Sequence, residues 1–360
     1  MKKYKLVIGL LALIMIISAC SPKQTTESTQ VSVDTMNITQ EMLNSSPEEP
    51  VGPKGGFEGI TIGFSQRRVA GSEWYEQLIR VAKLEAEHLG VNLVILDAQG
   101  QNAKQVSDIE DLLSRQVNAI ILNPNDSSAV LPAVKKIHDA NVPLVVVNSA
   151  LDPAGAPFTF VSTYAYDTGY KSGRALGDAV VAKYGWKDEI KAIVLSANPQ
   201  ELESDQRRWG QLAGYTDVML EKFGKSNLKI VGFDYYQWVP DQALAKMTDL
   251  LQANPDVDVV FSACDGGTQG VIPALENAGL AGNVLVTSID ARKSVLKWIK
   301  DGDKGVVADV SNDPRLMGKW AVYFAAYAAS GQPGPSTFYV PNPAVTVNNI
   351  DDHYDPDSLY

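Results

Sequence analysis

The sequence holds little of the material from which metal sites and disulfide scaffolds are built. Its 360 residues include two cysteines and three histidines, too few for a structural zinc site or a disulfide framework. Positive charge is also scarce, because 31 Lys and Arg stand against 42 Asp and Glu, for a formal net charge of -11. Binding to nucleic acid needs clustered basic residues, so this balance argues against a nucleic-acid partner.

Long hydrophobic runs are absent except at the N-terminus, where residues 6–17 form an almost unbroken apolar stretch behind three lysines. This stretch is too short for a membrane-spanning helix of about 20 residues but suits the core of a signal peptide. It ends in Ile-Ser-Ala-Cys at Cys20, which matches the lipobox of bacterial lipoproteins. We predict a signal peptide over residues 1–19 and lipidation of Cys20, with a secreted protein that carries a chance cysteine as the alternative. The lipid would hold the protein extracytoplasmically, on the outer face of the cytoplasmic membrane or in the periplasm.

The next segment, residues 20–56, is rich in Ser, Thr, Gln, Glu and Pro and contains no aromatic residue. Such a composition cannot bury enough apolar surface to fold alone. It predicts a flexible linker between the lipid and the folded body.

The remaining chain alternates short apolar runs with stretches of helical periodicity. Its length suggests two domains, and 45% hydrophobic with 20% charged residues is ordinary globular composition. We expect a first series of strands at 60–64, 91–96, 119–122 and 143–147, with helices at 73–89, 103–115 and 129–140. A second series has strands at 159–162, 191–195, 229–233, 257–261 and 284–287, with helices at 169–184, 205–223, 241–253, 268–278 and 291–300. Continuous apolar strands between helices predict an α/β fold of two parallel sheets, each covered on both faces.

Polar side chains gather where the predicted strands end. In open parallel sheets ligands bind at the carboxyl ends of the strands, and here those ends carry carboxylates, amides and hydroxyls with few basic groups. Aromatic residues lie just beyond two of the strand ends. Aromatic faces with carboxylates and amides suit a neutral hydroxylated ligand such as a sugar. The residues in question are Gln66, Trp74, Tyr75, Asn148, Trp238, Asp265 and Asp290.

The body resembles the periplasmic sugar-binding proteins of ATP-driven importers, nearest in pattern to the ribose-binding type. The resemblance runs from about residue 59 to 347 and is carried by the order and spacing of five stretches: 82–97, 121–130, 140–148, 254–261 and 270–279. It implies two doubly wound parallel-sheet domains joined by a three-segment hinge, with the ligand in the interdomain cleft. The chain would cross near 163–168, 311–313 and 342–345. The first lobe would then be 57–164 with 313–343, and the second 165–312 with 344–360.

The resemblance also implies which residues contact the ligand. The helix position that usually holds an arginine falls on Gln211, and Arg207 or Arg208, one turn earlier, would be the substitutes. The family's other binding positions fall on Ser72, Trp74, Tyr75, Trp238, Asp290 and Asn312.

Two positions depart from the ribose-type pattern. Asn148-Ser149 stands where those proteins usually have Asp-Arg, and Cys264-Asp265 stands where they often have Asn-Asp. Loss of Asp-Arg removes a charge-assisted clamp on ring hydroxyls. A ligand other than ribose is therefore expected: another sugar, a polyol or a furanone signal such as autoinducer-2.

These features favour a monomeric binding protein that passes its solute to a membrane permease. The alternative is a receptor of the same fold that senses a sugar or furanone and docks on a kinase or chemoreceptor. An enzyme is not favoured, because the sequence has no nucleophile elbow, Walker loop or metal-binding helix, and we expect no cofactor and no catalytic residues. A sugar-responsive repressor is excluded by the export signal and by the lack of a basic helix-turn-helix segment before residue 59.

Overall fold

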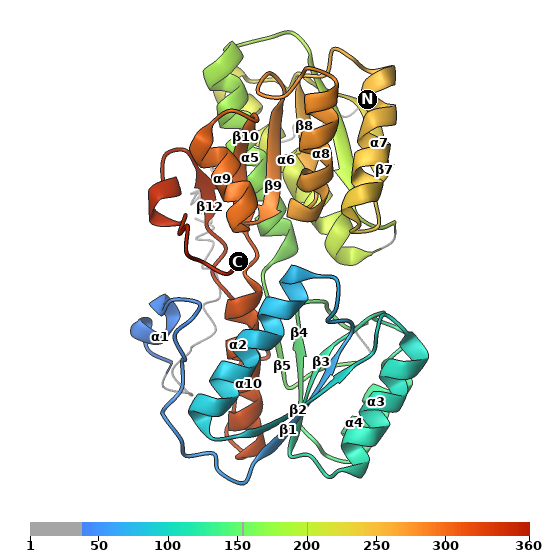
Figure 1. Cartoon of the computed structure of the whole chain (residues 1–360), viewed down its shortest axis with the longest axis vertical. Helices are drawn as coiled ribbons and strands as arrows, with labels where there is room; N and C mark the ends of the chain where they lie inside the picture. The colour runs from blue at the N-terminus through green and yellow to red at the C-terminus, as the bar shows by residue number, and fades with distance from the viewer. Residues whose placement is uncertain (1–37, 153–154, 200) are drawn as a thin grey trace, which may run out of the picture.

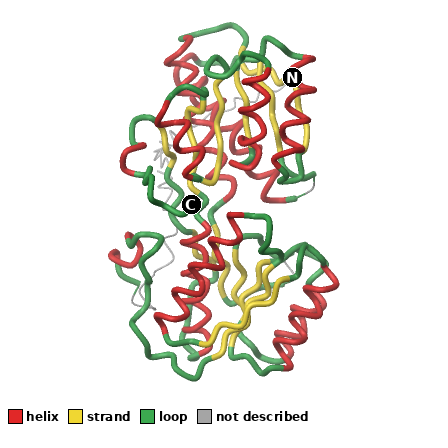
Figure 2. Tube along the Cα trace, in the orientation of Figure 1, coloured by secondary structure: helices red, strands yellow, loops and turns green. Residues whose placement is uncertain are grey.

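The computed structural model describes residues 38–152, 155–199 and 201–360. Within these residues the chain forms two α/β lobes, one above the other in Figure 1, each built on a six-stranded sheet. Helices cover both faces of each sheet, as the colouring by secondary structure makes plain in Figure 2. The predicted fold class is confirmed.

The first lobe contains an all-parallel sheet in the strand order β11-β5-β4-β3-β1-β2. Its strands are β1 (Thr61–Gln66), β2 (Asn92–Asp97), β3 (Ala119–Asn123), β4 (Leu144–Val147), β5 (Thr159–Ser162) and β11 (Thr337–Tyr339). Its helices are α2 (Glu73–Leu89), α3 (Asn102–Ser114), α4 (Leu131–Asp139) and α10 (Pro314–Ala329).

The second lobe has the strand order β12-β10-β9-β8-β6-β7, with only β12 antiparallel to its neighbour. Its strands are β6 (Ile190–Ser196), β7 (Leu228–Tyr235), β8 (Val259–Ser262), β9 (Leu285–Asp290), β10 (Val306–Ser311) and β12 (Ala344–Thr346). Its helices are α5 (Ala165–Tyr184), α6 (Leu202–Phe223), α7 (Pro240–Ala253), α8 (Asp265–Asn277), α9 (Lys293–Asp301) and the short 3-10 helix η2 (Ile350–Asp352).

The described chain passes between the lobes three times, after β5, after β10 and between β11 and β12. One sequence-based expectation is wrong here. Residues 159–162 were expected to open the second series of strands, but β5 pairs with β4 and belongs to the first sheet. No helix separates β4 from β5, so the alternation of strands and helices does not reveal to which sheet β5 belongs.

Both faces of each central strand are buried, which explains their continuous apolar sequence. In β3, Ala119 and Ile121 pack with the helices α2 and α10, whereas Ile120 and Leu122 pack with α3 and α4. Fully burying one such aliphatic side chain contributes about 1.5–3 kcal/mol. The second lobe repeats this layering with α7, α8 and α9 on one face and α5 and α6 on the other.

Helices α5 and α6 approach each other unusually closely through glycines. A Cβ atom at Gly173 would collide with the backbone carbonyl of Gln211, and one at Gly214 would collide with that of Tyr170. Only hydrogen at these positions permits the contact. The close packing sets the position and rotation of α6, and therefore determines which of its side chains reach the space between the lobes.

Residues 38–56 do not behave as the flexible linker that their composition predicts. The segment contains the short helix α1 (Gln40–Asn44) and lies against the first lobe, where Val51 is 4% exposed. The ammonium group of Lys319 donates to the hydroxyl of Ser45 at 2.8 Å and to the carbonyl of Ser46 at 2.8 Å.

A second charged group holds the same segment. The carboxylate of Glu85 accepts hydrogen bonds from the backbone N–H groups of Val51 at 2.9 Å and Gly52 at 3.1 Å. Charged hydrogen bonds of this kind contribute about 1.5–3 kcal/mol each. They replace the hydrophobic burial that the segment's own sequence lacks.

The C-terminal residues cross from the second lobe to the first. Lys293 of α9 donates to the carbonyl of Ser358 at 2.5 Å, and Gln77 of α2 donates to the carbonyl of Leu359 at 3.1 Å. Tyr360 is 3% exposed and lies with the first lobe's core. This tail therefore adds a contact between the lobes beside the three crossings.

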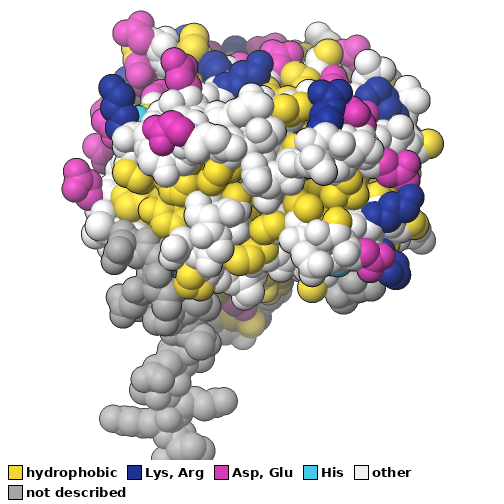
Figure 3. Space-filling view, turned by 90° about the horizontal axis from the view of Figure 1, so that it is seen from below, with side chains coloured by type: hydrophobic (Ala, Val, Ile, Leu, Met, Phe, Trp, Pro, Cys, Tyr) yellow, Lys and Arg dark blue, Asp and Glu magenta, His cyan; other side chains and the backbone are white. Residues whose placement is uncertain are grey.

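The end of the first lobe presents a mixed surface. Seen from the end of the first lobe, charged side chains of both signs lie around the rim, with hydrophobic ones between them (Figure 3). Among the helices of residues 38–360 that the structure describes, none is long and apolar enough to cross a bilayer.

The glycine contact predicts a specific sensitivity to volume. We expect Gly173→Ala to lower the free energy of unfolding by about 1–3 kcal/mol, because the added methyl group must push α6 away. Alanine favours helices by about 1 kcal/mol over glycine, so the propensity alone predicts the opposite sign. Urea denaturation measures the difference, with Asp178→Ala on the exposed side of α5 as the control. An unchanged or raised stability of Gly173→Ala would contradict the packing argument.

Candidate ligand-binding site

A cavity of about 90 Å³ lies between the two lobes, at the carboxyl ends of the strands. Residues from both lobes and from the crossing after β10 line it. They are Arg67, Arg68, Ser72, Trp74, Tyr75, Asn148, Glu201, Glu203, Arg207, Trp238, Cys264, Gly266, Asp290, Arg292 and Asn312. The strands β1, β4 and β9 deliver Arg67, Asn148 and Asp290 to this point, because each of these residues stands at or just after the strand's end.

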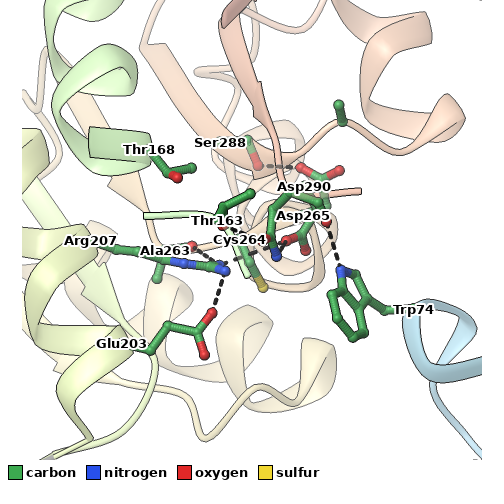
Figure 4. A network of polar contacts seen from close by, with 12 residues as sticks. Trp74, Thr163, Thr168, Glu203, Arg207, Ala263, Cys264, Asp265, Ser288 and Asp290 are labelled. Carbon is green, nitrogen blue, oxygen red and sulfur yellow. Dashed lines mark hydrogen bonds and ion pairs between the residues drawn. The ribbon is translucent and has the colours of Figure 1, made fainter. Parts of the chain in front are cut away.

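Asn312 connects the two walls of the cavity. Its backbone carbonyl accepts a hydrogen bond from the indole N–H of Trp74 at 2.9 Å. Its side-chain oxygen accepts from the hydroxyl of Thr163 at 2.7 Å, and its amide nitrogen donates to Asp290 at 3.1 Å. Figure 4 shows Trp74 reaching from the first lobe toward this network in the second. The floor of the cavity is thus the place where two of the three crossings meet.

Arg207 is the main cation of the second lobe's wall. It comes from α6 and is 2% exposed, and its guanidinium lies over the ring of Trp238 at 5.5 Å from the ring centre. The guanidinium donates to Glu203 at 2.5 Å and to the carbonyl of Ala263 at 3.1 Å, and it lies 3.7 Å from Asp290. Its Nε atom has no partner among the described residues. An unpaired buried donor is costly, and a polar ligand in the cavity would satisfy it.

Asp290 combines a strained backbone with a buried carboxylate. Its φ angle is 132°, a conformation that residues with a side chain rarely adopt and that concentrates at functional sites. Burial raises the pKa of Asp290, and the charge of Arg207 opposes this shift. The charged form of the Asp290 carboxylate is therefore stabilised by neighbouring side chains, among them Arg207, rather than by water.

Two further carboxylates lie behind Asp290. Asp265 accepts from the hydroxyl of Ser288 at 2.5 Å and from the backbone N–H of Arg292 at 2.7 Å. Asp309 accepts from the backbone N–H of Ala291 at 3.0 Å. Burial raises the pKa of Asp265 to about 7 and also raises the pKa of Asp309. Both groups stabilise the turn after β9 that carries Asp290.

A larger cavity of about 760 Å³ adjoins the first and also lies between the lobes. Arg67, Asn148, Glu201 and Glu203 line both cavities. Its other walls come from the residues after β3 and β4 and from the region of the first crossing, including Tyr164 and Tyr339. The space between the lobes is therefore continuous around Arg67.

A profile of the periplasmic binding protein domain matches residues 62–333. The chain belongs to the periplasmic binding protein domain family. The ribose import binding protein RbsB of Salmonella typhimurium is 31% identical over 251 residues, which are 70% of this chain and 79% of that protein. The protein of the same name from Bacillus subtilis is 28% identical over 287 residues, or 80% of this chain and 87% of that one. The resemblance to ribose-type sugar-binding proteins is confirmed.

Solved structures agree with this membership. An ABC transporter periplasmic solute binding protein from Actinobacillus succinogenes with bound D-allose has a TM-score of 0.72 and 26% identity, covering 81% of this chain and 99% of that one. A solute binding protein from Mycobacterium smegmatis with bound glycerol has a TM-score of 0.72 and 28% identity, covering 81% and 96%.

In this periplasmic binding protein the structure brings together seven of the residues that the sequence places in the site. They come from both lobes and from the crossing after β10. They are Ser72, Trp74, Tyr75, Asn148, Trp238, Asp290 and Asn312.

Two residues of α6 that the sequence places in the site, Gln211 and Arg208, do not line either cavity. Gln211 lies deeper, where its amide donates to the carbonyl of Ser262 at 2.8 Å. Arg208 pairs with Asp205 of the same helix at 2.7 Å. It also donates to the hydroxyl of Tyr235 in β7 at 3.1 Å. Arg207, named in the sequence only as a substitute, occupies the cavity because the rotation of α6 directs that position inward.

Gln66 and Asp265 are also outside both cavities. Gln66 is fully buried, accepts from the side chain of Asn123 at 3.1 Å and donates to the carbonyl of Arg68 at 2.7 Å. It orders the loop after β1 instead of facing the ligand space. Asp265 lies behind Asp290, as described above, although its neighbours Cys264 and Gly266 line the smaller cavity.

Several charged lining residues were missed by the sequence reasoning. Arg67 and Arg68 directly follow Gln66, Glu201 and Glu203 begin α6, and Arg292 follows the end of β9. The strand-end rule would have found the arginines if it had been extended by two residues. The glutamates carry no such signal, because their place depends on the rotation of α6.

The buried carboxylate Asp265 predicts a pH dependence of stability. Its native pKa of about 7 lies above the ordinary value of 3.8, so between those values the native state binds more protons than the unfolded state. The contribution of Asp265 to the free energy of unfolding is then fully present at low pH. It falls as pH rises toward 7, by roughly 1 kcal/mol per pH unit. Asp265→Asn should flatten this slope.

Urea titrations at several pH values between about 4 and 8 measure the effect, with the exposed Asp178→Asn as the control. Parallel pH dependence in the wild type and Asp265→Asn would contradict the assignment.

Proposed function

We propose that this protein is an extracytoplasmic solute-binding lipoprotein that captures a sugar or sugar-like solute between its lobes and delivers it to the permease of an ABC importer. The observation that carries the proposal is the interlobe cavity, where aromatic rings from both lobes accompany Asn148 and Asp290 at the strand ends and Arg207 of α6. The names of the relatives, which are sugar-binding proteins of importers, support it.

The chemistry of the lining suits a ring with hydroxyl groups. Tyr75 and Trp238 can cover the apolar C–H faces of such a ring. Asp290 accepts hydrogen bonds from hydroxyls, and the Nε atom of Arg207 can donate to one. Binding needs no covalent step, and we expect no turnover of the solute.

Capture by hinge closure follows from the three crossings. Two lobes joined by three crossings can rotate toward each other around a bound solute. The cavity includes groups from both lobes, so the full set of contacts forms only when the lobes approach. The permease would then recognise the closed arrangement.

The lipid anchor belongs to the same proposal. The signal peptide over 1–19 and the lipidated Cys20 lie outside the described residues. Residues 38–56 rest on the first lobe, and the remainder of the predicted linker, residues 20–37, lies outside the described residues. We propose that the protein is a monomer held at the membrane by this lipid and presented to the permease at short range.

Thermal-shift and calorimetric titrations with pentoses, hexoses, polyols and autoinducer-2 test the function on the mature chain. A solute at about 100 times its dissociation constant should stabilise the protein by roughly 2.7 kcal/mol. Asp290→Asn and Trp238→Ala should weaken binding by about 10- to 100-fold, because each loses a contact of about 1.5–3 kcal/mol.

Trp209→Ala is the matched control, because Trp209 is 52% exposed on α6 and does not line either cavity. A shift with autoinducer-2 alone would favour a signal receptor. No binding by the folded protein across the whole panel, or binding that Asp290→Asn and Trp238→Ala leave intact, would contradict the proposal.

A further inference from the structure

The two walls of the interlobe cavity carry opposite charge. To the smaller cavity the first lobe contributes Arg67 and Arg68 and no carboxylate, since its other lining residues there are Ser72, Trp74, Tyr75 and Asn148. Asp126 and Asp152 of the first lobe line only the larger cavity. The second lobe contributes three carboxylates and two arginines: Glu201, Glu203, Asp290, Arg207 and Arg292. A solute in this space therefore meets a cationic side and a side of weakly negative net charge.

Each carboxylate of the second wall already has a donor. Glu201 accepts from the indole N–H of Trp238 at 2.8 Å. Glu203 is paired with Arg207 at 2.5 Å. Asp290 accepts from the amide of Asn312 at 3.1 Å. These groups are engaged within their own lobe or at its crossing, and none of them forms an ion pair within 4 Å with the arginines of the first lobe.

The arginines of the first wall have no such partner. Within the part of the chain that the structure describes, neither Arg67 nor Arg68 forms an ion pair within 4 Å of a carboxylate. Arg67 is half-buried, and its guanidinium donates to the hydroxyl of Ser149 at 3.3 Å. The guanidinium groups of Arg67 and Arg68 each lie 5.9 Å from the centre of the Tyr75 ring.

This arrangement is a prepared anion site. Tyr75 holds the two guanidinium groups near its ring, and Arg67 lines both the small and the large cavity, so a bound solute reaches it from either side. Among the described residues, Arg67 lacks a carboxylate within hydrogen-bond distance, although the charges of Glu201, Glu203 and Asp126 act on it from farther away, and burying a cation without a direct ion-pair partner is unfavourable. An anionic group on the solute would remove that penalty and gain charge-assisted hydrogen bonds.

We propose that the preferred solute is a carboxylate-bearing sugar, a uronic or aldonic acid, and that Arg67 and Arg68 recognise its carboxylate. This inference rests on the function proposed above and names its ligand class. The hydroxyls of the sugar lie toward Asp290 and Arg207, and the carboxylate lies toward the first lobe. The planar guanidinium fork matches a carboxylate in two parallel hydrogen bonds.

A sugar phosphate fits the same site less well. It carries up to two negative charges near neutral pH, and the opposite wall presents three carboxylates that would repel them. A single negative charge confined to one end of the sugar avoids that repulsion. The anionic group of the solute is therefore expected to be a carboxylate rather than a phosphate.

Calorimetric titration of the mature protein with matched pairs tests the inference. The probes are D-glucuronate with D-glucose, D-galacturonate with D-galactose, D-gluconate, and glucose 6-phosphate. We expect at least one acid to bind about 10- to 100-fold more tightly than its neutral parent, by one or two charge-assisted hydrogen bonds. Arg67→Gln should weaken binding of the acid more than binding of its neutral parent, so that the ratio of the two affinities falls toward one.

Arg115→Gln is the control for overall charge, because Arg115 is exposed at the end of α3 and paired with Asp111 at 2.7 Å, outside both cavities. Equal weakening of acid and neutral sugar in Arg67→Gln would overturn the inference, because it would indicate that Arg67 pairs with Glu201 or Glu203 when the lobes close. Tighter binding of neutral sugars, or of the phosphate, would also overturn it.

The two proposals fail in different ways. Binding of a neutral sugar that Asp290→Asn abolishes, without any preference for an acid, would keep the solute-binding function and refute the acid selectivity. No binding of any sugar, neutral or acidic, would refute both.

Discussion

The hydrogen bonds of Asn312 are the constraint on which the site depends. One residue at the crossing after β10 accepts from Trp74 of the first lobe, accepts from Thr163 at the crossing after β5 and donates to Asp290 of the second lobe. The floor of the cavity and the junction of the two lobes are therefore the same group of atoms. Under the proposed function, a solute that contacts Asp290 would act directly on this junction, which would link binding to closure of the lobes.

Several charged groups of the second lobe are buried, which is unfavourable for the stability of the fold. Asp265, Asp290 and Asp309 are all buried at the turn after β9, and burial raises the pKa of each. Arg207 and Arg292 lie beside them, and the Nε atom of each arginine has no partner among the residues described. Networks of this kind stabilise a fold less than apolar packing would. Their position at the ligand space is consistent with selection for binding rather than for stability.

Much of the fold could be predicted from the sequence because the central strands are buried on both faces. The continuous apolar runs and the intervening helices indicated two parallel sheets, and the strand ends indicated where polar side chains would converge. The alternation of strands and helices could not show to which sheet β5 belongs, since no helix precedes it and its apolar pattern suits either sheet, whereas the lobe bounds implied by the family resemblance placed residues 159–162 in the first lobe. Residues 38–56 escaped prediction for another reason, because the charged partners that hold them, Glu85 and Lys319, are distant in sequence.

The site was predictable to the extent that it depends on strand ends and not on helix rotation. Trp74, Asn148 and Asp290 follow from their place after strands. Arg207 rather than Gln211 faces the cavity because glycines let α5 and α6 approach closely and so set the rotation of α6. That rotation is a property of two packed helices and has no signature within either one.

Small-angle X-ray scattering of the mature protein, with and without a saturating solute from the binding screen, tests the central claim most directly. The radius of gyration should be smaller with solute, because the lobes are expected to close on it around the crossing that contains Asn312. Asp290→Asn should need about 10- to 100-fold more of the same solute for the same decrease, because its binding is weakened by that factor. An unchanged radius of gyration in the wild type, at concentrations where calorimetry shows saturation, would contradict the account.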